Sequence, residues 1–306
     1  MIENKFTKEY DRLDLFAKNT VEGFITGLHK SPYHGFSVEF AEHKVYNQGT
    51  STRHIDWKLF ARTDKLFVKR YEEETNLRCQ IVIDVSSSMY FPIQKKTSLL
   101  KPNKLIFSIC CAASLMNLLK RQRDAVGLTL FSEKIEFHSV PKTTSKHHAI
   151  LLNQLEEKIK IFSQNKKTFT LKSLHEIAEK IHRRSLIILF TDMIDKSNNS
   201  EELFSALQHL KFNKHEVIIF NVQDYSKEVN FDYDNNPYKF IDLENKNEIR
   251  LFSDEVRKNY VAKQQDFLNK LKLKCMQYKI DLIDADINKG YNNILSSYLL
   301  KRSKLY

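Results

Sequence analysis

The chain has 306 residues, of which 42% are hydrophobic, and it contains only 6 Gly and 5 Pro. This composition can fill the core of one large domain, or of a large and a small one, and it excludes low-complexity sequence. The formal net charge of +11 fits either an anionic partner or a lysine-rich solvated surface. Because no block of Lys and Arg is interleaved with aromatic residues, we expect no nucleic-acid binding.

The cysteines and the apolar runs indicate the cellular compartment. Cys79, Cys110, Cys111 and Cys275 form neither a C-x-x-C pair nor a disulfide framework, so we expect free thiols in a reducing compartment. The first residues lack the pattern of a secretory signal, and no apolar run reaches the roughly 18 residues of a membrane-spanning helix. We therefore expect a cytoplasmic protein without membrane insertion.

The first 76 residues are predicted to form a helix and a small β-rich layer. Apolar residues recur with a helical period over residues 10–30. Alternating apolar residues over 36–46, and a short run of apolar and basic residues over 66–71, predict strands. We assign residues 1–76 to this N-terminal part and 77–306 to the main domain.

From residue 77 onward, strand-like runs alternate with helical segments, which predicts a doubly wound α/β fold with a mostly parallel sheet and helices on both faces. The predicted parallel strands are Gln80–Val85, Ala125–Phe131, Ser185–Thr191, Glu216–Val222 and Ile280–Asp284. The run 135–139 follows the second strand so closely that it must pair antiparallel to it, as an edge strand. Residues 236–252 are predicted to form an inserted hairpin.

Polar side chains follow two of the predicted strands. The first strand ends in Asp84, and Ser86 and Ser88 follow at a spacing of two, so the three side chains point toward one spot. The strand that begins at residue 185 is followed by Asp192. Ligands of open parallel sheets bind beyond the carboxyl ends of the strands. These oxygen donors suit Mg²⁺ or Mn²⁺ and not zinc, so we predict a metal site here.

Other interpretations remain open at the same positions. Ser and Asp are good helix N-caps, so Asp84, Ser86 and Ser88 could serve local structure alone. A Mg²⁺-dependent phosphoryl hydrolase would also place carboxylates at strand ends, but no nucleophile–base pair can be nominated. No nucleotide-binding glycine motif occurs either. We therefore predict neither catalytic nor cofactor-binding residues.

Several segments resemble the bacterial family called domain of unknown function 58, which carries a von Willebrand factor A-like domain. The similar segments are Gly27–His43, Arg53–Lys58, Ala61–Asp64, Phe67–Arg78 and Tyr298–Lys304. The resemblance covers nearly the whole chain. It implies the strand order 3-2-1-4-5-6, a two-part architecture and frequent genomic pairing with MoxR-type AAA+ ATPases.

The resemblance also implies a metal-ion-dependent adhesion site. In such a site the D-x-S-x-S loop, a threonine and a further aspartate hold Mg²⁺, and a partner's carboxylate takes the open position. The matching threonine is Thr168, with Thr170 as the alternative, although Thr168 could equally cap the helix predicted from residue 172. We therefore expect a non-enzymatic interaction module whose partner is a MoxR-type ATPase or its client.

Overall fold

The computed structural model describes residues 13–28, 43–45, 57–69, 77–93, 101–160, 171–193, 200–243 and 247–303. By their contacts, the residues group into two compact units, Thr26–Asn76 and the remainder of the chain. The larger unit contains the sheet and the helices around it. None of the described helices is both long and apolar enough to cross a membrane.

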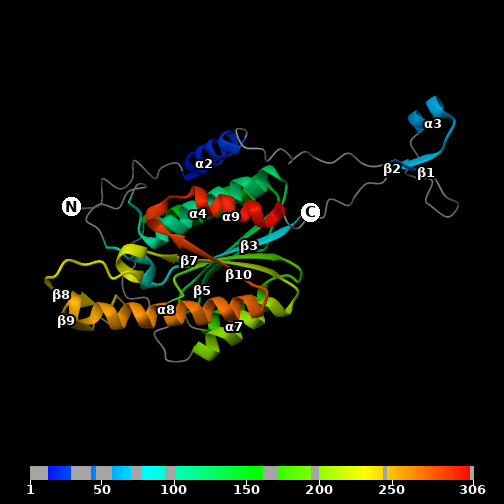
Figure 1. Ribbon diagram of the computed structural model, residues 1–306. Coiled ribbons are helices and arrows are strands. Elements are labelled where there is room, and N and C mark those ends of the chain that lie inside the picture. Colours follow the sequence, from blue (N-terminus) through cyan, green and yellow to red (C-terminus); the bar gives the residue numbers. More distant parts are fainter. Residues whose placement is uncertain are drawn as a thin grey trace. The chain divides into compact units, whose positions relative to one another are not determined.

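A six-stranded sheet forms the centre of the larger unit (Figure 1). Its strands, in spatial order, are β10 (Asp281–Asp286), β7 (Glu216–Gln223), β6 (Leu186–Thr191), β3 (Arg78–Asp84), β4 (Ala125–Phe131) and β5 (Ile135–His138). All neighbouring strands are parallel except β4 and β5, which are antiparallel. This confirms the predicted doubly wound fold, its strand order and its antiparallel edge strand.

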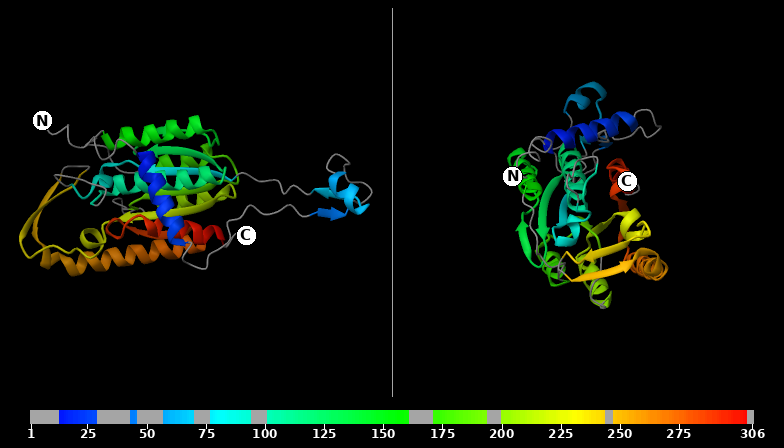
Figure 2. Two further views of the ribbon diagram at one scale, coloured as in Figure 1. Left: turned by 90° about the horizontal axis from the view of Figure 1, so that it is seen from above. Right: turned by 90° about the vertical axis from the view of Figure 1, so that its left-hand side faces the viewer.

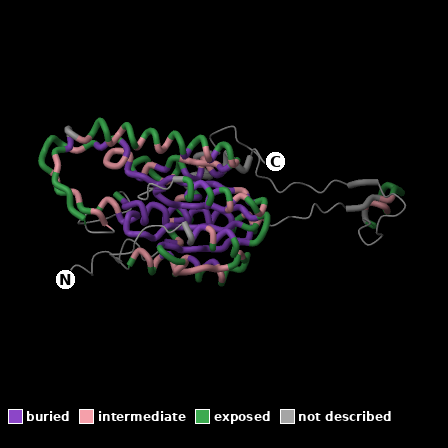
Figure 3. The backbone as a smooth tube through the Cα atoms, turned by 90° about the horizontal axis from the view of Figure 1, so that it is seen from below, coloured by how far each residue is buried: buried purple, intermediate pink, exposed green. Residues whose placement is uncertain are grey.

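Helices cover both faces of the sheet, as its buried strands require. One face carries α4 (Lys104–Arg121), with α5 (Ser145–Lys160) and α9 (Asn292–Ser303) packed beside it. The other face carries α6 (Leu171–Lys180), α7 (Ser200–Phe212) and α8 (Ser253–Gln277). The two helical layers on either side of the sheet are visible in Figure 2. Figure 3 shows that the buried backbone is concentrated in the layer between them.

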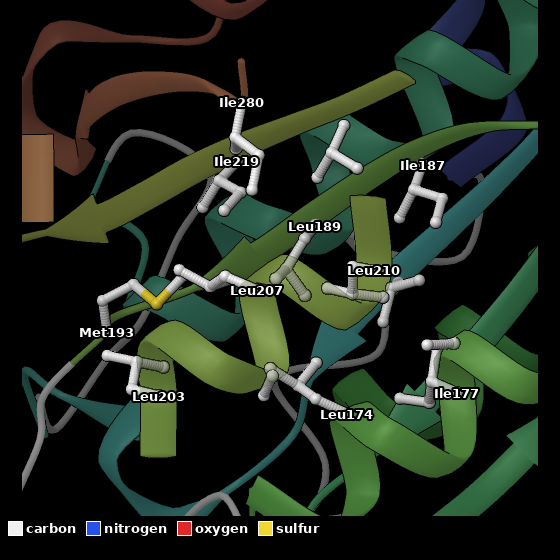
Figure 4. Packing of buried hydrophobic residues seen from close by; sticks show 14 of the residues in the cluster. Leu174, Ile177, Ile187, Leu189, Met193, Leu203, Leu207, Leu210, Ile219 and Ile280 are labelled. Atoms are coloured by element: carbon white, nitrogen blue, oxygen red, sulfur yellow. The ribbon is translucent and has the colours of Figure 1, made fainter. Parts of the chain in front are cut away.

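The apolar layer under α6, α7 and α8 holds the strands in place. Leu174 and Ile177 of α6 and Leu207 of α7 pack against Leu189 of β6 and Ile219 of β7, and all five side chains are fully buried (Figure 4). Burying one such side chain contributes about 1.5–3 kcal/mol. Because the strands are anchored over their whole length, the loops at their carboxyl ends start from fixed positions.

An inserted hairpin lies between β7 and α8, as predicted. Strands β8 (Pro237–Ile241) and β9 (Glu248–Phe252) pair antiparallel. A π-helical turn, η3 (Tyr225–Val229), joins β7 to this region. An aromatic cluster connects the hairpin to α8 and consists of Phe231, Tyr233, Tyr238, Phe240 and Tyr260. The sequence did not predict η3.

The smaller unit ends at Asn76, where the sequence predicted a boundary, but it begins at Thr26 and not at residue 1. The helix α2 (Leu13–Leu28) groups with the sheet as far as residue 25. Its Leu13, Ala17 and Val21 are buried, and Phe16 packs edge-on against Tyr291. The smaller unit contains β1 (His43–Val45) and β2 (Phe67–Lys69), which pair antiparallel, and α3 (Trp57–Thr63). The first residues of the predicted strand 36–46 lie outside the described part.

A candidate cation site at the strand ends

Asp84 is fixed at the end of β3 by hydrogen bonds from the loop that follows β3 and from the last residue of β6. The backbone N–H of Ser86 donates to Asp84 Oδ1 at 2.9 Å, and the hydroxyl of Thr191 donates to Oδ2 at 3.0 Å. The backbone N–H of Val85 also donates to the carbonyl of Phe131 at 2.8 Å, which ties the loop to β4. Asp84 is fully buried. Its carboxylate therefore has one orientation, set by β3, β4 and β6 together.

The hydroxyls of Ser86 and Ser88 lie beside each other, 3.1 Å apart and buried. The short 3-10 turn η2 (Ser87–Tyr90) brings them together. Neighbouring ligands at about 2.0–2.1 Å from an octahedral Mg²⁺ are separated by roughly 2.9 Å. The hydroxyl pair therefore has the spacing of two adjacent ligands. Ser86 precedes η2, but its side chain makes no capping hydrogen bond, which disfavours the capping role.

Asp192 directly follows β6, and its side chain is buried at the same end of the sheet. Two effects raise the pKa of Asp84 to about 7. The larger is burial of its carboxylate, and the second is repulsion by the negative charge of Asp192. The structure therefore brings Asp84, Ser86, Ser88 and Asp192 to one place, which we call the strand-end site. Thr168 and Thr170 lie outside the described residues, so the choice between them stays a prediction.

A lysine that the sequence analysis did not single out reaches this site. The ammonium of Lys104 donates to Asp192 Oδ2 at 2.9 Å and to Glu228 Oε1 at 2.6 Å. Burial lowers the pKa of Lys104, but attraction by the two carboxylates outweighs it and the pKa is raised overall. Burial raises the pKa of Glu228 despite the opposing effect of Lys104. The lysine is therefore held as a cation by two buried carboxylates.

The sequence contained a signal for Lys104 but none for Glu228. Lys104 is the first residue of α4, whose N-cap Asn103 accepts a hydrogen bond from Ile106 N–H at 2.8 Å. A cation at the positive end of a helix dipole is unfavourable unless carboxylates lie nearby. Glu228 belongs to the π-helical turn η3, a rare conformation that often occurs at functional sites but that no residue pattern announces.

The donors at the strand-end site fit a small divalent cation. Three carboxylates and one ammonium gather there, so the charged groups leave an excess of negative charge that a divalent cation would offset. Asn221, which pairs with Thr191 across β6 and β7, is fully buried, and no hydrogen bond involves its side-chain amide. Within the described residues, no group of three His, Cys, Asp or Glu could hold a metal. A metal here would therefore depend on the serine hydroxyls.

The described part of the strand-end site offers no arrangement for nucleophilic catalysis. Among the described residues, the hydroxyls of Ser86 and Ser88 lie within hydrogen-bond distance of each other, and neither hydroxyl bonds to a histidine. The buried ammonium of Lys104 is held as a cation between carboxylates, so it cannot serve as a base.

Comparison with known proteins places the chain in a sequence family. The family described as "protein of unknown function DUF58" matches residues 42–267. An uncharacterized protein of Mycobacterium tuberculosis is 30% identical over 79 residues, which are 26% of this chain and 25% of the relative. An uncharacterized protein of Mycobacterium bovis matches to the same extent. The alignment thus spans about a quarter of the length of these curated relatives.

Two solved structures are similar to the chain at low sequence identity. The conserved hypothetical protein BatB from Bacteroides thetaiotaomicron aligns with a TM-score of 0.43 at 16% identity, over 74% of this chain and 99% of that protein. A von Willebrand factor type A protein from Catenulispora acidiphila aligns with a TM-score of 0.33 at 16% identity, over 48% of this chain and 33% of that protein.

Proposed function

Because the chain belongs to the DUF58 family of proteins of unknown function, we propose that it is a non-enzymatic interaction module with a Mg²⁺ or Mn²⁺ ion at the strand-end site. Asp84, Ser86, Ser88 and Asp192 would hold the ion, together with Thr168. The observation that carries the proposal is the buried hydroxyl pair beside two strand-end carboxylates. An ion so held would bind a carboxylate of a partner protein.

The charges at the site explain why an incoming carboxylate would be attracted. Lys104 compensates one of the three carboxylates, and a divalent ion compensates the other two. The serine hydroxyls are neutral, so they coordinate the ion without reducing its charge further. Without the ion, Asp84 and Asp192 would repel the same partner group. The ion therefore decides whether a partner's Asp or Glu can enter.

The resemblance to DUF58 proteins supports a particular partner. We propose that the protein works in the cytoplasm with a MoxR-type AAA+ ATPase or with that ATPase's client. A single buried charged contact at the centre of an interface can dominate the binding energy. Loss of the ion should therefore weaken the complex more than loss of any exposed lysine at its rim.

Calorimetry tests the ion site directly. Mg²⁺ should bind the wild type, bind Ser86→Ala/Ser88→Ala more weakly, and not bind Asp84→Ala. A matched control is Ser297→Ala, which removes a serine hydroxyl that donates to Asn293 O within α9 at 2.8 Å. Equal Mg²⁺ binding by wild type and Asp84→Ala would refute the site.

A pull-down then tests the partner. Recovery of a MoxR-type ATPase by the wild type should be higher with Mg²⁺ than with EDTA, and Asp84→Ala should recover equally little under both conditions. Recovery that is the same in all four samples would refute carboxylate docking through the ion. Metal-dependent phosphatase turnover that Asp84→Asn abolishes would instead establish the rival hydrolase function. Binding to duplex DNA with a steep salt dependence would support the nucleic-acid alternative.

A further inference from the structure

The ammonium of Lys104 lies beside Asp192 in the strand-end site. It is fully buried and donates to Asp192 Oδ2 at 2.9 Å. Asp192 is one of the proposed ligands of the ion. An ion and an ammonium that share one carboxylate repel each other, and burial strengthens this repulsion because little solvent screens it. Binding of the ion is therefore opposed by a cation that belongs to the protein.

A second acceptor for Lys104 is already in place. Glu228 Oε1 lies 2.6 Å from the ammonium, and the other carboxylate oxygen accepts from the backbone N–H of Asp224 at 2.8 Å. The hydroxyl of Tyr260, on α8, donates to the backbone carbonyl of Glu228 at 2.9 Å. Glu228 is thus fixed from both ends. It can keep the ammonium if Asp192 turns to another cation.

We infer that Lys104 is a tethered counter-cation that the divalent ion displaces from Asp192, so that Glu228 alone then holds it. This inference rests on the ion site proposed above. In the absence of the ion, the lysine offsets the charge of Asp192 and keeps that carboxylate in position. In its presence, the lysine sets the affinity by repulsion. The same residue therefore maintains the empty site and limits how tightly the ion is held.

When the ammonium moves from Asp192 to Glu228 alone, the change at the ion site reaches the hairpin region. Glu228 belongs to η3, which leads into the hairpin region, and Tyr260 of the aromatic cluster donates a hydrogen bond to the backbone carbonyl of Glu228. Phe231, two residues after η3, packs on Tyr260 and on Phe240 of β8 with ring centroids 4.8 and 5.5 Å apart. If Glu228 alone holds the ammonium of Lys104, the change in its hydrogen bonds acts first on the backbone of η3, to which Glu228 belongs. The hairpin region is therefore where occupancy of the ion site would be detected.

Calorimetry with Mg²⁺ at one fixed pH tests the repulsion. Lys104→Met should bind Mg²⁺ at least about tenfold more tightly than the wild type, because the competing charge is gone. The matched control is Lys180→Met, which removes an exposed lysine that pairs with Glu176 across one helical turn, at 2.8 Å. It should stay within about twofold of the wild type. Unchanged or weaker binding by Lys104→Met would overturn the inference.

A second variant covers the case in which Lys104→Met does not fold without the ion. Lys104→Gln removes the charge but keeps a hydrogen-bond donor for Asp192, and it should show the same tightening. Hydrogen exchange on the wild type needs no variant at all. Added Mg²⁺ should change the exchange of the backbone amides of Tyr225–Val229, and exchange that does not respond would refute the coupling to η3.

A double-mutant cycle tests the role of Glu228. Glu228→Gln should weaken Mg²⁺ binding when Lys104 is present and have a smaller effect in the Lys104→Met background. An equal effect in both backgrounds would mean that Glu228 acts on the ion directly, which contradicts the transfer. The controls also separate the two proposals. If neither wild type nor Lys104→Met binds Mg²⁺, the ion site itself is refuted. If Asp84→Ala abolishes binding and Lys104→Met has no effect, only the role of Lys104 is refuted.

Discussion

Replacing Asp84 by Asn should stabilise the metal-free protein, by an amount that depends on pH. Burial and the charge of Asp192 raise the pKa of Asp84 from 3.8 to about 7 in the folded protein. At roughly 1.4 kcal/mol per pKa unit, the charged carboxylate then costs about 4 kcal/mol at pH 8. The amide of Asn has no charge, can accept from Ser86 N–H, and can donate to the hydroxyl of Thr191.

The sign of the pH dependence follows from the direction of the pKa shift. Between pH 4 and 7 the folded protein retains a proton on Asp84 that the unfolded chain has lost, so the contribution of Asp84 to stability falls as the pH rises through this window. Above the folded pKa the loss is complete. Asp84→Asn removes this dependence. The variant should exceed the wild type by about 2–4 kcal/mol at pH 8 and by less than about 1 kcal/mol at pH 4.

Urea unfolding followed by circular dichroism in EDTA, over pH 4 to 8, measures this difference. The matched control is Asp14→Asn, which removes a half-exposed carboxylate paired with Lys18 at 2.6 Å, and should change stability by less than about 1 kcal/mol at every pH. Mg²⁺ at about a hundred times its dissociation constant should then add about 2.7 kcal/mol to the wild type and nothing to Asp84→Asn. A variant that is destabilised equally at all pH values would refute the reasoning.

Three further predictions test other parts of the structure. Gly127→Ala would place a Cβ only 2.6 Å from the carbonyl oxygen of Ser139. The free energy of unfolding, measured with urea, should therefore fall by about 2–4 kcal/mol, and a fall of less than about 0.5 kcal/mol would contradict the packing. Burial lowers the pKa of His148 to about 4, so this histidine contributes a loss of stability as the pH falls from 6.5 toward 4, opposite in sign to the contribution of Asp84. The stability of His148→Leu relative to the wild type should therefore rise as the pH falls through this window; a difference that does not change with pH would disprove this. Asp192→Ala should abolish Mg²⁺ binding in calorimetry and cost about 1–3 kcal/mol, because Lys104 keeps only one carboxylate; retained binding would remove Asp192 from the site.

The sequence by itself determined the sheet and which polar residues follow the carboxyl ends of two of its strands. Strands β3 and β6 are continuous apolar runs because both of their faces are buried, and such runs are readable without any tertiary information. Asp84, Ser86 and Ser88 lie close together in the sequence, so the local turn after β3 is enough to gather them at the end of the strand. The position of Asp192 followed from a general property of parallel sheets, that their carboxyl ends meet along one edge.

Tertiary structure decided which groups face these local motifs. Lys104 lies 88 residues from Asp192 and 124 from Glu228 in the sequence, and no periodicity relates the three. Their meeting depends on where α4 begins over the sheet and on the π-helical turn after β7. The assignment of α2 to the sheet, rather than to the β-rich N-terminal layer, depends likewise on Leu13, Ala17 and Val21 finding an apolar surface. Hydrophobic periodicity predicts that a residue is buried, whereas only the packed fold determines which residues it packs against.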